Sequence, residues 1–192
     1  MAEAVAKVAR RVNKVVEDGE NHLDLADCAL SSFPTGLYFA TSAVADKILS
    51  ISLTNNQLKS LPGKFCTTFK QLQELNIDGN FLEKLPHEAS LLCNLKIINL
   101  ARNKLGTFPD ELTEMQCIES INLEGNQIKG QVHGTTLHYL TQPSERERQF
   151  LKENIPIETL KCLPRLSSVN LKLNPINKDA LNLSDIKFEL LL

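Results

Sequence analysis

The sequence predicts an α/β fold: a solenoid of about six repeated coils, with a parallel sheet along its concave side and a cover at each end. Three observations predict this fold. One apolar pattern recurs along most of the 192 residues, a polar residue inside it recurs at nearly constant spacing, and a segment with helix-like apolar spacing precedes the first copy. A single copy cannot bury its own apolar side chains, so consecutive copies must stack on one another.

The repeated pattern is L-x-x-L-x-L-x-x-N-x-L, and four segments follow it in full. They begin at Ile48, Leu72, Leu95 and Ile118, and the first three continue to a proline. A shorter copy runs from Leu23 to Pro34, and a last copy runs from Leu166 to Ile176. Copies that keep one register in this way are the signature of a leucine-rich repeat solenoid, or horseshoe.

The L-x-L core of each copy predicts a short strand whose leucines point into the coil, while the intervening residues line the concave surface. The recurring Asn is unusual for a strand. Its amide both donates and accepts, so it can satisfy buried backbone groups where the chain leaves the strand. Cys28 stands at the Asn position of the first copy, and this repeat class accepts that substitution. The Asn position therefore marks the register of each coil.

The spacing of the Asn position locates an insertion. Its steps are 24, 23 and 23 residues from Asn56 to Asn126, whereas the next step, from Asn126 to Asn174, is 48 residues. Removing residues 131–154 restores the pattern across the join. We therefore expect a 24-residue insertion at one corner of the repeats, which together span residues 20–176.

Both ends of a solenoid need covers. Residues 1–19 predict a capping helix, because valines recur at helical spacing and Gly19 follows as a stop. These valines are Val5, Val8, Val12, Val15 and Val16. Arg10 and Arg11 are expected on the solvated face of that helix. Residues 177–192 predict a C-terminal cap. Its apolar side chains are Leu181, Leu183, Ile186, Phe188 and Leu190.

Five segments outside the insertion carry a resemblance to a known family. They are residues 59–62, 67–69, 74–82, 174–175 and 186–188, which read KSLP, TTF, ELNIDGNFL, NP and IKF. The chain resembles the intracellular leucine-rich repeat proteins of the 23-residue type. That resemblance implies a cytoplasmic, non-enzymatic horseshoe that serves as a protein-binding scaffold or regulator in signalling. The insertion departs from the family, and it could be a functional loop, a splice variant or unremoved noncoding sequence.

Charge and composition argue against several other classes. The net charge of -2 and the pI of about 6.1 give no basis for binding nucleic acid or an anionic membrane. No apolar run reaches the roughly 18 residues of a membrane helix. The histidines lack metal-ligand spacing and no glycine-rich phosphate loop follows a strand, so no metal or cofactor is expected. The histidines are His22, His87, His133 and His138.

The cysteines favour a reducing compartment. Their number is odd, and no pair has the spacing of a zinc or redox motif. They are Cys28, Cys66, Cys93, Cys117 and Cys162. We expect most of them to be buried, and Cys93 and Cys117 to fill the core beside strand starts. A thiol-dependent enzyme is the weaker functional alternative.

The register also predicts a candidate binding surface on the concave face, which is small, polar and mildly acidic. The predicted partner-binding residues are Asp24, Ser52, Glu74, Asn76, Asp78, Asn99, Asn122, Glu124 and Asn170. No catalytic residue is predicted. The expected partner is another protein, held by a monomeric chain that binds neither nucleic acid nor membrane. A nuclear repeat protein associated with histones or RNA is the alternative.

Overall fold

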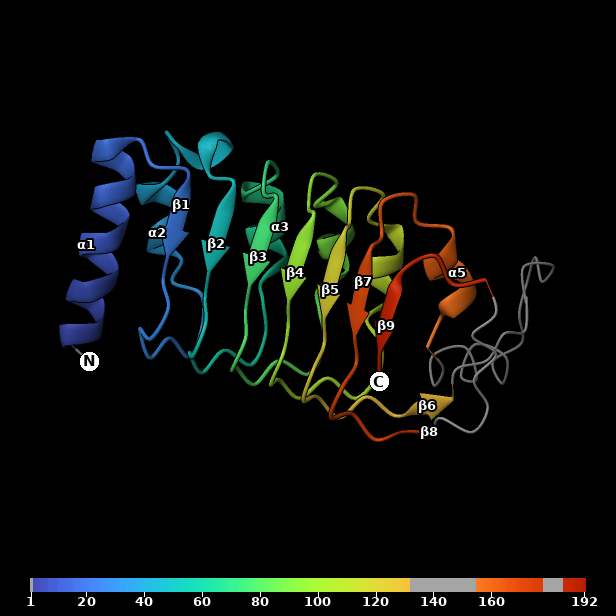
Figure 1. Ribbon diagram of the computed structural model, residues 1–192. Coiled ribbons are helices and arrows are strands. Elements are labelled where there is room, and N and C mark those ends of the chain that lie inside the picture. Colours follow the sequence, from blue (N-terminus) through green and yellow to red (C-terminus); the bar gives the residue numbers. More distant parts are fainter. Residues whose placement is uncertain (1, 132–154, 178–184) are drawn as a thin grey trace.

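The computed structural model describes residues 2–131, 155–177 and 185–192 and shows coils stacked side by side (Figure 1). Seven strands form one parallel sheet, in the order β1-β2-β3-β4-β5-β7-β9. They are β1 (His22–Asp24), β2 (Ser50–Ser52), β3 (Glu74–Asn76), β4 (Ile97–Asn99), β5 (Ser120–Asn122), β7 (Ser168–Asn170) and β9 (Glu189–Leu191). The predicted α/β leucine-rich repeat solenoid is therefore confirmed.

Short helical segments carry the chain back along the other side of the sheet (Figure 1). They are α2 (Gly36–Ala40), α3 (Gly63–Thr68), α5 (Ile157–Lys161) and 3₁₀ helices at Ala45–Lys47, His87–Leu91 and Asp110–Glu114. A proline directly precedes α3, α5 and the last two 3₁₀ helices. Proline suits these positions because its fixed φ allows a helical turn to begin while it cannot extend the sheet.

The strands align residue for residue, so each strand contributes one central side chain to a continuous core. That inward column is Leu23, Ile51, Leu75, Ile98, Ile121, Val169 and Leu190. Its first six members are no more than 1% exposed. Each buried aliphatic side chain of this size stabilises the fold by about 1.5–3 kcal/mol. The stack of coils, rather than any one coil, supplies that burial.

The recurring Asn side chains join neighbouring coils as the sequence predicts. Asn80 Oδ1 accepts a hydrogen bond from the Leu58 backbone N–H (3.0 Å) in the preceding coil. Its Nδ2 donates to the backbone oxygens of Leu53 (2.9 Å) and Ile77 (3.0 Å), one in each coil. Asn56, Asn103 and Asn126 repeat this arrangement and are likewise buried. Each of these amides satisfies backbone groups of two coils that water does not reach.

The long step in the repeat spacing corresponds to a single coil in the structure. β5 pairs directly with β7, and Asn174 Oδ1 accepts the Ile128 N–H of the preceding coil (3.0 Å). Beside this corner, β6 (Gly130–Gln131) pairs with β8 (Ile176–Asn177) in a separate parallel pair. The predicted insertion lies outside the described residues, apart from Gln131.

The N-terminal end is covered by α1 (Ala2–Asp18), which stands beside β1 (Figure 1). Val8, Val12 and Val15 are buried against the first coil, at the i, i+4, i+7 spacing of one helix face. Val5 and Val16 are exposed, so the predicted five-valine stripe is wrong at those two positions. They fall outside the narrow line along which a single helix touches the edge of a sheet.

The C-terminal segment does more than cover the last predicted strand, because it adds a strand of its own. β9 pairs in parallel with β7 and extends the sheet to seven strands rather than the six predicted. Phe188 is buried, and Ile186 and Leu190 are partly buried against the core. Leu181 and Leu183, which were also assigned to the cap, lie outside the described residues.

The cysteine prediction is largely wrong. Cys28 and Cys66 are buried, but Cys93 and Cys162 are exposed and Cys117 is partly exposed. Cys93 and Cys117 lie at the corner where the chain turns back into the sheet, and the core positions there belong to other residues. Leu95 and Ile118, the first apolar positions of the repeat pattern after these cysteines, are fully buried.

Candidate functional site: the concave face

The predicted binding residues lie on the concave face of the sheet, in three columns that run across the strands. The strand register places Glu74 in the first column and Asp24, Ser52, Asn76, Asn99, Asn122 and Asn170 in the second. Asp78 and Glu124 follow their strands in the third column. The side chains of all the second-column residues are partly buried, because neighbouring strands flank them.

The second-column Asn residues have a fixed orientation. The Oδ1 atoms of Asn76, Asn99 and Asn122 each accept the backbone N–H two residues further along, at 3.1 Å. This local turn explains why Asn recurs at these strand ends. Since Oδ1 is occupied by the backbone, Nδ2 is the free end of each amide. Among the described residues, the Nδ2 atoms of Asn76, Asn99 and Asn122 have no acceptor.

At both ends of this row the equivalent side chains are already paired. Asn170 Nδ2 donates to Glu124 Oε2 (2.9 Å). Asp24 Oδ1 accepts the Ala26 N–H (2.9 Å), and its Oδ2 lies 3.2 Å from Arg11 Nη2 of α1. The middle of the sheet, over β3, β4 and β5, is therefore where unpaired amide donors gather.

Two of the four acidic residues predicted on this face, Asp24 and Asp78, are paired with arginines. Asp78 accepts two hydrogen bonds from Arg102, at Nε (2.8 Å) and Nη2 (2.6 Å). These hydrogen bonds, reinforced by the charge of Asp78, raise the pKa of the Arg102 guanidinium. Glu74 has one weak contact, 3.5 Å from Ser50 Oγ. Among the four predicted acidic residues, Glu74 is thus the one whose carboxylate is least engaged.

Two residues on or beside this face were not predicted from the sequence. Ile97, directly between Glu74 and Ser120 in the first column, is 42% exposed. Its signal was visible, since an isoleucine stands where the other strands carry polar residues. Arg102 adopts φ 52°, at the coil position that Gly79 and Gly125 occupy in neighbouring coils. Other coils carry Asp27, Asn55 and Leu173 at this position, also with positive φ, so the alignment of the repeats does not single out Arg102.

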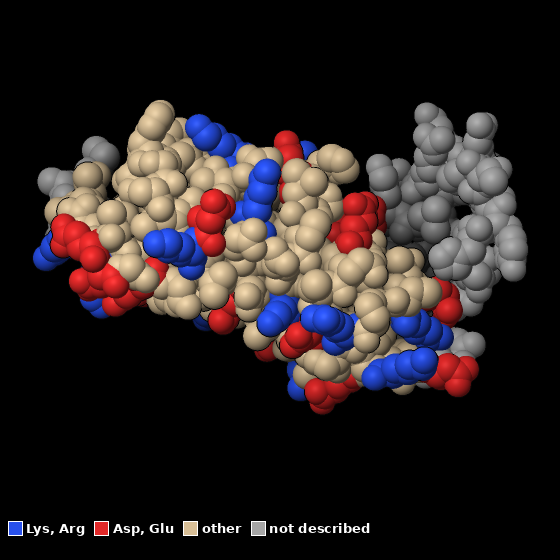
Figure 2. Space-filling model, turned by 90° about the horizontal axis from the view of Figure 1, so that it is seen from above, with Lys and Arg blue, Asp and Glu red and all other residues tan. Residues whose placement is uncertain are grey.

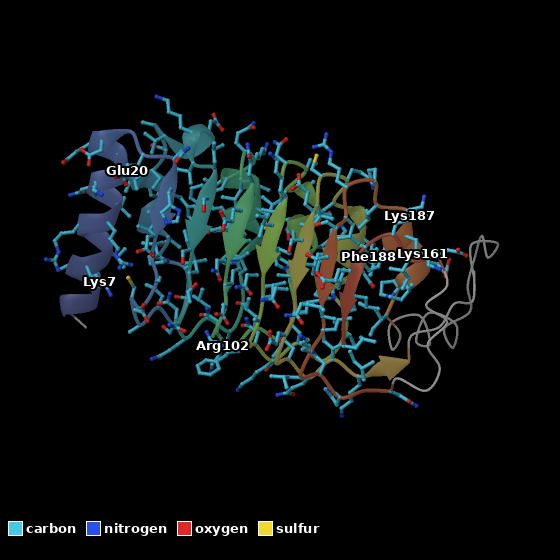
Figure 3. The ribbon with its side chains drawn as sticks, in the orientation of Figure 1. Lys7, Glu20, Arg102, Lys161, Lys187 and Phe188 are labelled. Carbon is cyan, nitrogen blue, oxygen red and sulfur yellow. The ribbon has the colours of Figure 1, made fainter. Side chains whose placement is uncertain are left out.

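Cross-strand contacts hold the rest of the first column. His22 Nδ1 lies 3.0 Å from Ser50 Oγ, and Ser120 Oγ lies 3.0 Å from Ser168 Oγ. Figure 2 shows that acidic and basic residues are intermixed on the face seen from above, with most of that surface formed by other residues. Figure 3 shows Arg102 at the lower border of the sheet. The strand contacts described above therefore leave the concave centre polar, with Asp24 and Asp78 paired to arginines.

Several chemical roles find no support in the described residues. No cluster of three or more His, Cys, Asp or Glu side chains in the described ranges could hold a metal ion. Burial raises the pKa of the Cys66 thiol to about 12, so it stays protonated and is a poor nucleophile. In the described part of the chain, no helix combines the length and apolar character that a membrane crossing requires.

Comparisons with known proteins agree with this architecture. A leucine-rich repeat family model matches residues 70–128. Among solved structures, the Toll–Spatzle complex from Drosophila contains a chain that superposes with a TM-score of 0.55 at 21% identity, covering 77% of this chain and 18% of that one. This similarity shows the fold alone.

Two curated relatives share more of the sequence. Leucine-rich repeat-containing protein 20 from Homo sapiens is 56% identical over 96 residues, which is 50% of this chain and 52% of that protein. The protein of the same name from Mus musculus is 43% identical over 194 residues, covering 100% of this chain and 92% of that protein. The full-length match confirms the resemblance drawn from the sequence: the chain belongs to the family of leucine-rich repeat-containing protein 20.

Proposed function

We propose that this chain is a non-enzymatic scaffold or regulatory adaptor that binds another protein on the centre of its concave face, in the cytoplasm and within intracellular signalling. The observation that carries the proposal is the row of unpaired Nδ2 donors on Asn76, Asn99 and Asn122, with exposed Ile97 beside it. Fixed donors beside an exposed aliphatic side chain suit a polypeptide, which offers both carbonyl acceptors and apolar side chains.

The dimensions of the face support the same proposal. Parallel strands lie about 4.8 Å apart, so a seven-stranded sheet spans roughly 29 Å. That length accommodates a helix or an extended segment of a partner. Aromatic anchors are missing from the predicted site residues, and Arg102 is bound to Asp78. The interface therefore lacks the usual strongest contributors to affinity, and we expect weak or transient binding.

A charge-reversal variant would be a poor test of this proposal. Reversing the charges of Glu74, Asp78 and Glu124 together would also break the Asp78–Arg102 and Glu124–Asn170 contacts. Ile97→Lys is sharper, because Ile97 is exposed and has no such role. Leu91→Lys is the matched control, since Leu91 is 49% exposed on a 3₁₀ helix away from the sheet.

The measurement is affinity purification with the native chain and both variants as baits, followed by quantitative mass spectrometry. We expect Ile97→Lys to lose partners that Leu91→Lys retains, because a lysine at position 97 disrupts the apolar contact at the centre of the face. Partners that survive Ile97→Lys unchanged would show that the concave centre is not the binding site.

A further inference from the structure

β9 ends the sheet with an open edge, since no strand within the described residues lies on its outer side. On its inner side, the Glu189 N–H donates to Ser167 O (2.8 Å), and Leu191 O accepts the Leu171 N–H (2.7 Å). Consecutive residues of a strand direct their backbone groups to opposite sides, so the N–H and C=O of Leu190 point away from β7. An edge of this kind is a template for another strand.

The opposite edge of the same sheet is covered by α1, which also supplies side-chain donors to some of its backbone oxygens. Arg11 Nη1 of α1 donates to the outward backbone oxygens of Asp24 (3.2 Å) and Ala26 (2.7 Å). Lys7 Nζ lies 2.7 Å from Asp27 O. No comparable contacts are made to the outward groups of Leu190 by the described residues. Figure 3 marks the two ends with Lys7 and Phe188.

The side chains under the open edge are apolar. Phe188 is buried, while Ile186, Leu190 and Leu192 are partly buried against the core. A strand that adds to this edge must therefore bring apolar residues at alternate positions on the core side. It must also present backbone groups in register with Leu190. The added strand must also accommodate the carboxylate of Glu189, which projects from the concave side of β9.

We propose that a second copy of this chain occupies this edge, with the two β9 strands pairing antiparallel across a two-fold axis centred on Leu190. In that register Leu190 and its equivalent exchange both backbone hydrogen bonds. Phe188 pairs with Leu192 of the other copy, so apolar residues meet on the core side. The arrangement is closed and isologous, and it leaves neither β9 with an open edge.

The charges of β9 also suit this register. Glu189 lies opposite Leu191 of the other copy rather than opposite its equivalent, so no like-charge pair forms. Because the two-fold axis is perpendicular to the sheet, both concave faces open to the same side. Two copies of the proposed binding surface would then act together, which raises the effective affinity of weak contacts. The inference replaces the monomer expected from the sequence, and it does not depend on the proposed function.

Leu191 provides a matched pair of variants that tests the register. Leu191→Glu places a carboxylate opposite Glu189 of the other copy, twice in each dimer. Leu191→Lys places an ammonium there instead. Nonspecific apolar association would be weakened equally by both substitutions, whereas the proposed register separates them by sign. Leu191 is partly exposed and points to the concave side, so both variants retain the core.

The measurement is sedimentation equilibrium of the full chain from about 1 μM to about 300 μM. We expect the native mass to rise toward twice 21.4 kDa. Leu191→Glu should weaken the dimer about tenfold, and Leu191→Lys should leave it equal or tighter. A native mass of one chain at the highest concentration overturns the proposal, and so does equal weakening by both variants.

A second measurement needs no variant. The Leu190 amide should exchange its hydrogen more slowly as the concentration of the native chain rises, because it becomes hydrogen-bonded across the dimer. The Leu171 amide, already bonded to Leu191 O within the chain, is the internal reference. Fast exchange of Leu190 at every concentration would contradict the proposed pairing.

Discussion

The two ends of the sheet solve the same problem in different ways. At the N-terminal end, α1 places three buried valines over the first coil, and its Arg11 donates to Asp24 O in β1 and to Ala26 O just after it. At the C-terminal end, β9 adds one more strand but leaves the backbone of Leu190 directed outward. A helix covers the first strand, whereas the C-terminal end adds another strand whose own outer edge needs covering.

The difference shows that the end of a solenoid must be covered in two respects. The apolar requirement is that the core side chains of the last coil are buried, and the backbone requirement is that its outward N–H and C=O groups find hydrogen-bond partners. The apolar requirement is met at both ends, because Val12 and Phe188 are buried. The backbone requirement is met in part at the N-terminal end, where Arg11 donates to Asp24 O and Ala26 O, and no comparable side-chain donor among the described residues reaches the outward groups of Leu190. The end that comes closer to meeting both requirements should contribute more to stability, and the other end should be available for association.

The largest expected effect comes from disturbing the covered end. Val12 is 2% exposed, so Val12→Asp would bury a carboxylate without a partner and lose the packing of the valine. We expect a loss of about 4 kcal/mol in the free energy of unfolding. Ile186→Asp, at the partly buried C-terminal end, should cost about 1 kcal/mol. Urea denaturation followed by circular dichroism measures both, and equal losses would contradict the difference between the ends.

The next prediction, with a smaller expected loss of stability, compares the recurring Asn of an interior coil with that of the last coil. Asn103 is buried, and its amide holds the Leu82 N–H (3.0 Å) and the oxygens of Ile77 (2.9 Å) and Leu100 (3.0 Å). Asn103→Ala leaves those groups unsatisfied and should cost about 2–3 kcal/mol. Asn174 makes the same kind of contacts but is only partly buried. Asn174→Ala should therefore cost less, since water can replace some of the lost hydrogen bonds.

Asn99→Ala is the control for this series. Its Oδ1 accepts one backbone N–H on the concave face and its Nδ2 has no acceptor in the described structure. We expect a cost below about 1 kcal/mol. The same denaturation experiment compares all three variants. If Asn99→Ala and Asn103→Ala shifted the midpoint equally, the division between the buried Asn ladder and the surface row would be wrong.

The sequence was sufficient for the periodic part of this fold. Leucine spacing and the Asn position predicted the strand register through β7, because stacking forces equivalent residues of every coil into one column. The seventh strand was not predicted, since the segment Glu189–Leu191 lacks a following Asn. Its place depends on pairing with β7, which is a tertiary contact.

The candidate site was predicted less completely, for a related reason. Register assigned all nine residues to one face, but it carries no information on which side chains pair with each other. The Asp78–Arg102 and Asp24–Arg11 ion pairs depend on side-chain reach between coils and between α1 and β1. Arg11 was expected to be solvated, and that expectation is wrong because the helix packs with this face toward the sheet edge. Unpaired amides can be recognised only after such pairs are known.

The smallest expected effect tests the backbone requirement by itself. Arg11→Met keeps the apolar stem of the side chain but removes the donors to Asp24 O and Ala26 O. We expect a loss of about 1 kcal/mol, because the arginine is partly exposed and water can reach the freed carbonyls. Arg10→Met is the matched control: Arg10 is exposed and its Nε contacts Ala6 O within its own helix (3.3 Å). It should leave the unfolding midpoint unchanged.

The same pair of variants links the two ends. If donors from α1 keep the β1 edge closed, Arg11→Met should gain a concentration-dependent increase in sedimentation mass that Arg10→Met lacks, since the freed edge becomes a template for strand addition. The valines of α1 still cover the core side of β1, so this gain should be weaker than association through β9. An Arg11→Met chain that matches Arg10→Met in both stability and mass would show that apolar packing alone closes the N-terminal edge.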